Sequence, residues 1–519
     1  REVCATAKHD RAMANSNPSG PPARAPQSLI WLGLLALAAY AVILGTHTSV
    51  VASGSDQSGY LNSAHLFAAG RLKTDLRTPA EFGPQSALSR IQFLPLGFWA
   101  FAGDPQITPT YPTGLPLHYA FAALLLGWHA GPLAVSLFGA LGAIWLCYAT
   151  GRELGLDAWL AAAGAAALGL CPVLLFTSVQ PLSDTVATAW CLAAVWTVLR
   201  ARRAGRWAVA GGAAFAIAVL VRPTNLLLLP ALLVWLGWDW RRLLRFALGG
   251  LPGAAWLASY NHALYGGMFH SGYGDWFGTF ALAWGPATAC HFLKWLALLL
   301  PAPLLVLPFA AFAPPGIRGR DLVALALWFV AITGLYTFYV VSHEQWWCLR
   351  FILPATPALI LAGLLGVQAL ALRLGPGGRN RASALAALTI IVWAAGLSAF
   401  WVKRFAILKI AESETTFAKA CETARAQLPP GTLIVTLTFS GAIYRYTDFP
   451  ILRWDLVDTT QFTRLAALAR KTGRQVAALN YRWEDEIALG EHCIGNWVPA
   501  GHVGDATFWL LTPPRAEAR

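Results

Sequence analysis

Long apolar runs recur along this 519-residue chain, and charged residues are confined largely to the gaps between them. The hydrocarbon core of a bilayer is about 30 Å thick, so a spanning helix needs roughly 20 apolar residues. With 57% hydrophobic residues, 12% charged residues and a mean hydropathy of +0.53, the chain is typical of proteins that fold in lipid. The sequence therefore predicts a polytopic α-helical membrane protein. About eleven transmembrane helices are expected, at residues 28–48, 132–150, 157–177, 184–200, 207–221, 224–239, 245–259, 292–312, 322–341, 351–372 and 384–402.

Arginine clusters fall in alternate gaps between these predicted spans. Because Lys and Arg in short loops stay on the cytoplasmic side during insertion, these gaps should be cytoplasmic. The clusters are Arg152, then Arg200, Arg202, Arg203 and Arg206, then Arg241, Arg242 and Arg245, then Arg318 and Arg320, and finally Arg373, Arg379 and Arg381. The other gaps, including a first outer loop of about residues 50–131, then face the periplasm of a bacterial inner membrane. This sorting explains much of the net charge of +13, so membrane lipids and not nucleic acids are the expected surroundings.

Three regions are expected along the chain. Residues 1–27, which contain a possible start at Met13, read as a disordered cytoplasmic N-terminus, and residues 28–404 as the membrane domain. Residues 405–519 read as a soluble extracytoplasmic domain, because strand-length apolar runs alternate there with amphipathic helices. Helices are predicted at 412–427 and 460–473, and strands at 432–439, 475–480 and 507–512. This alternation predicts a small α/β domain with a partly parallel sheet.

Cysteine spacing leaves the redox state of that domain open. Cys421 and Cys493 share the outer domain, where a disulfide between them and two free thiols are equally compatible with the sequence. No Cys-x-x-Cys or His/Cys spacing typical of a structural zinc site is present, so no bound metal is expected.

A single carboxylate, Asp56, follows the first apolar run closely and lies at the mouth of the membrane domain. At that position a carboxylate can act as a general base that removes the proton from an attacking hydroxyl group. The alternative is that Ser55 or Asp56 caps a helix that begins near Ser58 and lies flat at the membrane interface. Spacing alone favours the cap.

Two arginines, Arg222 and Arg350, lie at the outer ends of predicted spans and so break the sorting that the other arginines follow. A guanidinium group at the membrane edge can bind a phosphate through two parallel hydrogen bonds. Snorkelling of a long side chain toward water is the alternative for each of them. The two exceptions on one face make a phosphate site and snorkelling equally compatible with the sequence.

Further polar and aromatic residues of the outer gaps are candidates for a substrate cavity. They could bind an acceptor or a sugar ring, whereas helix capping by the aspartate and an interfacial aromatic belt are the simpler alternatives. These residues are Tyr60, Tyr111, Asp184, Asn261, Tyr265, Tyr273, His343, Glu344 and Trp347.

Taken in order, these motifs resemble the GT-C superfamily of integral-membrane glycosyltransferases over residues 28–404. The resemblance is closest to the polyprenyl-phosphate-sugar-dependent, family 39-type branch with the protein O-mannosyltransferases and the lipid A aminoarabinose transferase. Its motifs are Asp56 with Tyr60 and Leu61, then YPTGLPL (111–117), QPLSD (180–184), VRPTNLLLLP (221–230), YNHALYGG (260–267) and WWCLRFILPATP (346–357). The chain departs from relatives that carry two adjacent acidic residues, because Gln57 follows Asp56. It also lacks the lysine that precedes the paired prolines in the aminoarabinose branch, since Tyr111, Pro112 and Thr113 stand there.

The resemblance implies an inverting transfer of a sugar from a polyprenyl-phosphate donor to an acceptor hydroxyl, without a metal or other cofactor. It implies that Asp56 is the general base and that Arg350 and Arg222 bind the donor phosphate. The acceptor, whether protein, lipid or glycan, is left open. A multi-pass transporter or lipid flippase is the competing hypothesis, although the chain contains no internal repeat of the kind that transporters often show.

Overall fold

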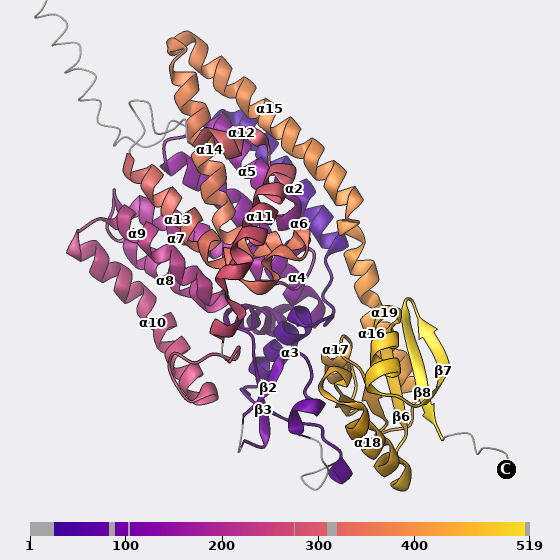
Figure 1. Cartoon of the computed structure of the whole chain (residues 1–519). Coiled ribbons are helices and arrows are strands. Elements are labelled where there is room, and N and C mark those ends of the chain that lie inside the picture. The colour runs from indigo at the N-terminus through magenta and orange to yellow at the C-terminus, as the bar shows by residue number, and fades with distance from the viewer. Residues whose placement is uncertain (1–24, 83–88, 102–103, 275, 309–318, 514–519) are drawn as a thin grey trace, which may run out of the picture.

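The computed structural model describes residues 25–82, 89–101, 104–274, 276–308 and 319–513. Its helices form one elongated bundle, and the C-terminal domain lies at one end of the bundle beside α3, β2 and β3 (Figure 1). The predicted N-terminal segment up to residue 24, with Met13, lies outside the described residues, as does Arg318 of one arginine cluster.

Several helices of the bundle are long and apolar enough to cross a membrane. Within the described residues these are α2 (Gln27–His47), α4 (Gly114–Glu153), α13 (Gly319–Thr337), the run Trp346–Leu372 formed by η8 (Trp346–Ala355) and α14 (Thr356–Leu372), and the Asn380–Arg404 part of α15 (Gly375–Arg404). The pair α5 (Ala158–Gly169) and α6 (Pro172–Ser178), bent by 57°, makes a sixth candidate. A multi-pass helical architecture is confirmed, while the count of eleven spans stays a prediction.

Further helices belong to the bundle. They are α7 (Ser183–Ala201), α8 (Trp207–Val221), η3 (Pro223–Leu228), α9 (Leu229–Leu236), α10 (Trp240–Tyr265), α11 (Gly285–Leu299) and α12 (Ala302–Val306). Pro223 and Pro230 follow the end of α8 closely, and proline lacks the N–H that a continuing helix needs. The chain therefore turns at Arg222, whose side chain lies largely buried at this end of the bundle.

Helix α4 consists of two helical parts. The range Gly114–Glu153 includes Gly127, whose φ of 82° and ψ of 168° are not helical, so the chain is kinked there. The part that follows Gly127, with Pro132 near its start, corresponds to the span predicted at 132–150. The part from Gly114 to the kink is a helix inside the first outer loop, which the sequence predicts to reach about residue 131.

The C-terminal domain is a five-stranded sheet covered by helices on both faces. Its elements are α16 (Ile410–Gln427), β4 (Leu433–Val435), α17 (Ser440–Tyr446), β5 (Ile451–Leu452), α18 (Thr459–Lys471), β6 (Val476–Tyr481), α19 (Arg482–Ile487), β7 (Asn496–Val503) and β8 (Ala506–Thr512). The strand order is β5-β4-β6-β8-β7, with β4 parallel to β5 and β6 and with β8 antiparallel to β6 and β7. The predicted α/β fold with a partly parallel sheet is confirmed.

Alternate residues of the central strands enter two separate cores. Leu433 and Val435 pack with Phe462 of α18, whereas Ile434 between them packs with Phe417 of α16. Cys493 belongs to the first core and Cys421 to the second, so the sheet separates them. Both cysteines are buried free thiols, which settles the open alternative in favour of two thiols.

Helix α3 (Asp56–Ala68) lies between the membrane helices and the C-terminal domain, not flat at a free interface. Its residues from Ser58 to Ala64 are all buried. Gly441 of α17 packs so closely on α3 that an added Cβ would overlap Ser58, and the Asn62 side-chain amide donates to the Gly441 carbonyl at 3.1 Å. The C-terminal domain thus holds α3, and with it Asp56, against the bundle.

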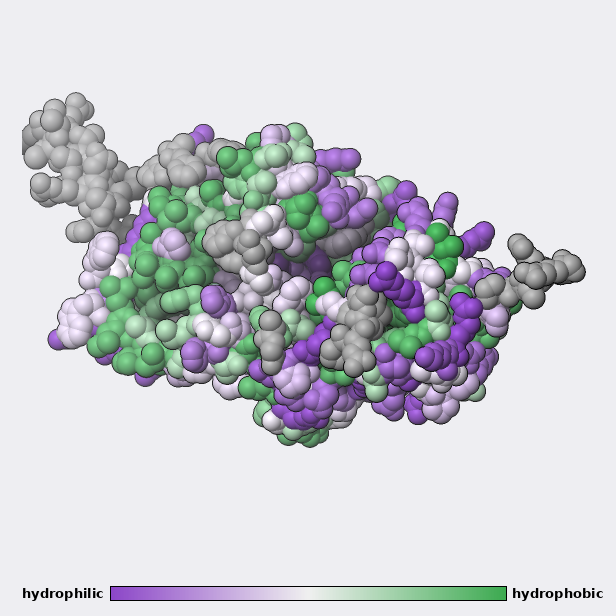
Figure 2. Space-filling view, turned by 60° about the horizontal axis from the view of Figure 1, so that its bottom comes forward, coloured by the Kyte–Doolittle hydropathy of each residue, from purple (hydrophilic) through white to green (hydrophobic). Residues whose placement is uncertain are grey.

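The surface reflects this division. In the space-filling view the hydrophobic residues gather over the helical bundle, and the hydrophilic ones gather over the C-terminal domain and the neighbouring outer segments (Figure 2). Those segments include a small sheet of β1 (Thr74–Asp75), β3 (Gln106–Pro109) and β2 (Phe98–Ala100), in that order.

Candidate active site

Four charged side chains meet where α3, α7, the end of α8 and η8 come together. The Arg350 guanidinium donates to Asp56 at 2.6 Å, and its other terminal nitrogen lies 3.8 Å from Asp184. Arg222 pairs with the second oxygen of Asp184. Because Asp56, Asp184, Arg222 and Arg350 come from distant parts of the sequence, only the fold makes them one cluster. Its charges balance, which is what a largely buried cluster requires.

Asp56 is held as a carboxylate with a defined direction. The Tyr111 hydroxyl donates to its Oδ1 at 2.8 Å, and Arg350 binds its Oδ2. Burial alone would raise the pKa of Asp56, but the charge of Arg350 and the hydrogen bonds from Tyr111 and Arg350 outweigh it and leave the pKa below its usual range. The carboxyl group is therefore ionised at neutral pH, and its side chain remains 27% exposed.

The geometry does not support helix capping by the side chain of Ser55 or Asp56. The Ser55 side chain makes no capping hydrogen bond and instead contacts the Tyr111 hydroxyl at 2.7 Å. Gly59 makes this arrangement possible, because a Cβ at that position would overlap the Tyr111 ring. Tyr111 can therefore lie against α3 and reach Asp56.

Aromatic rings surround Arg350. Its guanidinium lies 5.3 Å from the Trp347 ring centroid and 5.1 Å from that of Phe351, within the range of cation–π attraction. Among the described residues, none accepts a hydrogen bond from its buried Nε. The Nε–H group of Arg350 is thus available to donate a hydrogen bond to an anion. Ordinary snorkelling toward water does not explain a side chain that is 13% exposed and ion-paired.

Aromatic and hydroxyl groups also surround Arg222, and one of them, Tyr336, is not among the candidates from the sequence. The Nη2 of Arg222 donates to the Tyr336 hydroxyl at 2.9 Å, and Thr224 lies 2.9 Å from the same hydroxyl. The Tyr336 ring stacks on Phe351 with centroids 5.3 Å apart. Tyr336 lies inside an apolar span, where a tyrosine carries no signal of its own in the sequence.

Two further candidates lie beside the cluster. The Tyr60 hydroxyl donates to Ser183 at 2.9 Å, next to Asp184 at the start of α7. Tyr273 places its ring edge-on to Tyr111 with centroids 6.1 Å apart, and 53% of Tyr273 stays exposed. The structure thus brings Tyr60, Tyr111, Asp184, Tyr273 and Trp347 together with Asp56.

The structure gives the remaining four candidates local contacts away from the charged cluster. Tyr265 donates to the Pro109 carbonyl and Asn261 to the Met268 carbonyl, so both support outer loops. His343 stacks on Trp284, and Glu344 is exposed. The sequence groups these residues with the site because they share outer gaps, but a shared face of the membrane does not specify a shared cavity.

A buried carboxyl group in the C-terminal domain also lies close to Asp56. Gln57 donates to Gln180 at 3.0 Å and to Glu414 of α16 at 3.4 Å. Burial raises the pKa of Glu414 from 4.5 to about 7, although the polar side chains of Ser49, Ser53 and Gln57 oppose the shift. Glu414 is thus a titratable contact between the domain and the helix that carries Asp56.

We expect Glu414→Gln to change how stability depends on pH. A raised pKa means that the folded state keeps a proton that the unfolded state loses, so stability falls as pH rises from about 4.5 to about 7 and is constant above that. The shift corresponds to about 3 kcal/mol at pH 8, which glutamine removes. Thermal unfolding at pH 5 and pH 8 should show a stabilisation by Glu414→Gln that is larger at pH 8. The matched control is Glu412→Gln, an exposed position on the same helix; an equal effect of Glu414→Gln at both pH values would contradict the expectation.

Comparison with known proteins gives a family match over part of the chain and several solved structures of similar fold. A family model described as dolichyl-phosphate-mannose-protein mannosyltransferase matches residues 122–260. This segment contains Asp184 and Arg222 but neither Asp56 nor Arg350. The search of curated proteins finds no similar sequence.

Among solved structures, ArnT from Cupriavidus metallidurans bound to undecaprenyl phosphate has a TM-score of 0.55 and 15% identity over 94% of this chain and 98% of that chain. Arabinofuranosyltransferase AftD from Mycobacteria has a TM-score of 0.53 and 13% identity over 95% of this chain and 42% of that chain. The Archaeoglobus fulgidus oligosaccharyltransferase, in complex with Zn and sulfate, has a TM-score of 0.50 and 14% identity, covering 87% and 68%. At these identities the likeness establishes a shared fold along nearly the whole chain.

Proposed function

We propose that this chain, which has the GT-C fold, is a membrane glycosyltransferase that moves a sugar from a polyprenyl-phosphate carrier to an acceptor hydroxyl. The observation that carries the proposal is an ionised carboxylate and two arginines gathered at the end of a membrane bundle. The family match and the shared fold support a glycosyltransferase with a lipid-linked donor. The arginine sorting supports placing this end on the periplasmic face of a bacterial inner membrane.

The arginines supply the positive charge that a lipid phosphate needs. Moving a phosphate to the edge of a bilayer costs free energy unless cations and hydrogen-bond donors replace water. Arg350, with its free Nε, and Arg222 provide such donors, and the aromatic rings of Trp347, Phe351 and Tyr336 keep their guanidinium groups in place. This charge makes a metal-independent reaction the simplest proposal.

Asp56 removes the proton from the acceptor. The acceptor oxygen bonds to the anomeric carbon as the carbon–oxygen bond to the phosphate breaks, the hydroxyl proton moves to the Asp56 carboxylate, and the leaving polyprenyl phosphate takes the bonding electron pair. Attack from the side opposite the phosphate inverts the anomeric carbon. Developing charge on the leaving phosphate is stabilised by Arg350 and Arg222.

The ion pair between Asp56 and Arg350 regulates the strength of this base. While Arg350 contacts Asp56, it lowers the pKa of the carboxyl group. A donor phosphate that binds Arg350 adds negative charge near Asp56 and competes for the same guanidinium, which raises that pKa. The base is therefore stronger when the donor is bound.

The test is a transfer assay with the full-length protein in nanodiscs, a panel of radiolabelled polyprenyl-phosphate sugars, and a bacterial membrane extract as acceptor. We expect transfer from one donor in the panel, which also identifies the sugar. If no donor is consumed while the protein moves polyprenyl-phosphate sugars across sealed vesicles, the transporter hypothesis replaces this one.

A further inference from the structure

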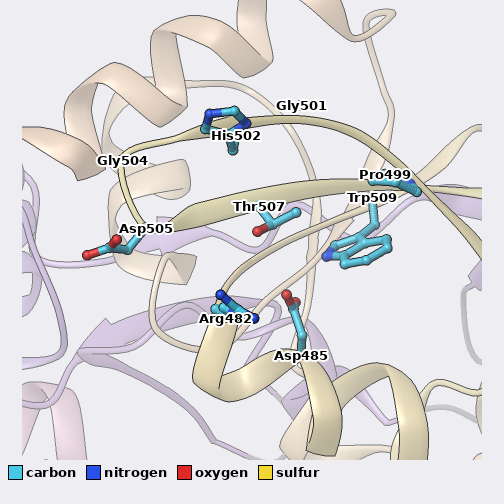
Figure 3. Close-up of a pocket in the computed structure, with 9 residues that line it drawn as sticks. All are labelled: Arg482, Asp485, Pro499, Gly501, His502, Gly504, Asp505, Thr507 and Trp509. Atoms are coloured by element: carbon cyan, nitrogen blue, oxygen red, sulfur yellow. The ribbon is translucent and has the colours of Figure 1, made fainter.

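A second concave site lies in the C-terminal domain, between its sheet and helix α19. Residues of the β7–β8 hairpin form one wall and the start of α19 forms the other, and the cavity volume is about 450 Å³. Figure 3 shows Thr507 and Trp509 pointing from β8 toward Arg482 and Asp485 of α19. The proposed transfer reaction uses none of these residues.

The lining combines an aromatic ring with donors and acceptors on both walls. Trp509 is half-buried, and its indole N–H, the Asn480 amide and Asp485 Oδ1 are buried polar groups that find no hydrogen-bond partner among the described residues. Burial of Asp485 raises the pKa of its carboxyl group. Arg482 is exposed at the rim, so the cavity is polar at its floor and open to solvent at its edge.

A neighbouring depression extends this cavity into a groove. It is lined by Ser413, Tyr481, Arg482, Trp483 and Asp505, so it shares Arg482 and Asp505 with the first. Trp483 is 66% exposed, and its ring lies nearly parallel to that of Tyr481 at 6.4 Å between centroids. The groove therefore carries one tryptophan in each half. Two indole rings can stack on successive rings of one ligand, so the groove suits a ligand of several rings.

The chemistry of the groove distinguishes among classes of ligand. A peptide could add to the edge strand β7, but Pro499 lacks a donor and the register shifts between Pro499 and Gly501, so the edge cannot pair continuously. Arg482 is balanced by Asp485 and Asp505, which disfavours a polyanion. A neutral saccharide fits, since its C–H faces stack on tryptophan and its hydroxyls pair with carboxylate, amide and guanidinium groups.

The groove adjoins helix α16, which also contacts the helix that carries Asp56. Ser413 of the second depression precedes Glu414, which accepts a hydrogen bond from Gln57, the residue after Asp56. A saccharide chain in the groove would thus be bound by the same domain that holds α3 in place.

We propose that this groove binds the saccharide chain of a glycan acceptor and presents its end to Asp56. The proposal rests on the proposed transferase function and gives that function an acceptor class. Retention of the chain in the groove would favour acceptors of several sugar units over single sugars.

The first test measures binding by saturation-transfer-difference NMR with the full-length protein in nanodiscs. The probes are neutral tetrasaccharides of glucose, mannose, galactose and N-acetylglucosamine. We expect one or more of them to bind, and we expect Trp483→Ala and Arg482→Ala each to raise the dissociation constant at least tenfold. Arg464→Ala, an exposed arginine on α18 outside the groove, should leave it unchanged. Both groove positions are exposed, so these variants should fold.

The outcomes separate this inference from the transferase function. Binding that persists in Asp56→Asn and weakens in Trp483→Ala supports the groove, whether or not sugar transfer is found. Binding of no tetrasaccharide, or binding that both groove variants leave intact, overturns the groove even when the transfer assay succeeds.

Discussion

Replacing Asp56 with asparagine is expected to reduce sugar transfer by about 100- to 10,000-fold, because a positioned general base contributes roughly that much and no other group of the cluster is free to accept the proton. Asp184, the other carboxylate, is 3% exposed and paired with Arg222. Asparagine can still accept hydrogen bonds from Tyr111 and Arg350, so the fold should persist. Turnover with the donor identified by the panel measures the effect.

Donor binding makes this prediction more specific. Without the charge of Asp56, Arg350 is held less firmly and is freer to bind phosphate. The affinity for undecaprenyl phosphate, measured by calorimetry in nanodiscs, should be unchanged or higher in Asp56→Asn. Asp448→Asn serves as the matched control, since the Asp448 side chain is fully exposed on the C-terminal domain. A folded Asp56→Asn protein with near wild-type turnover would rule out Asp56 as the base.

The sequence predicts the fold class well because membrane helices and amphipathic elements obey strong local rules. Apolar length identifies the long spans, and alternation of helix and strand identifies the α/β domain, where the two predicted helices differ from α16 and α18 by about two residues at most. The short elements α17, β5 and α19 are not predicted. Strand β7 is not predicted either, since most of its residues are exposed at the edge of the sheet and carry no alternating apolar pattern.

The candidate site is less predictable for a different reason. Asp56, Arg222 and Arg350 stand out because each breaks a local rule, whereas their partners do not. Tyr336 looks like any tyrosine of an apolar helix, and Glu414 looks like a surface residue of an amphipathic helix. Their roles depend on contacts between segments more than 100 residues apart, which no local pattern encodes.

Arg350 provides the second large expected effect. Arg350→Gln removes charged hydrogen bonds worth about 1.5–3 kcal/mol each, so the dissociation constant for undecaprenyl phosphate should rise by about 100-fold. Arg350→Lys keeps the charge but loses the planar fork that contacts Asp56 and Asp184 together, so a rise of about tenfold is expected. The lysine variant also keeps a counter-charge beside the two aspartates, which protects the fold. Arg425→Gln, an exposed position on α16, is the matched control.

A pH profile separates this role from a merely structural one. Arg350 lowers the pKa of Asp56, so the base of the wild-type enzyme stays ionised to low pH. In Arg350→Gln that lowering is lost, burial dominates, and the pKa of Asp56 rises. The acid limb of the pH–rate profile at low donor concentration should therefore move to higher pH in Arg350→Gln and stay in place in Arg425→Gln. If the limb does not move although donor affinity falls, Arg350 binds phosphate without tuning the base, and the control of Asp56 by the donor would have to be abandoned.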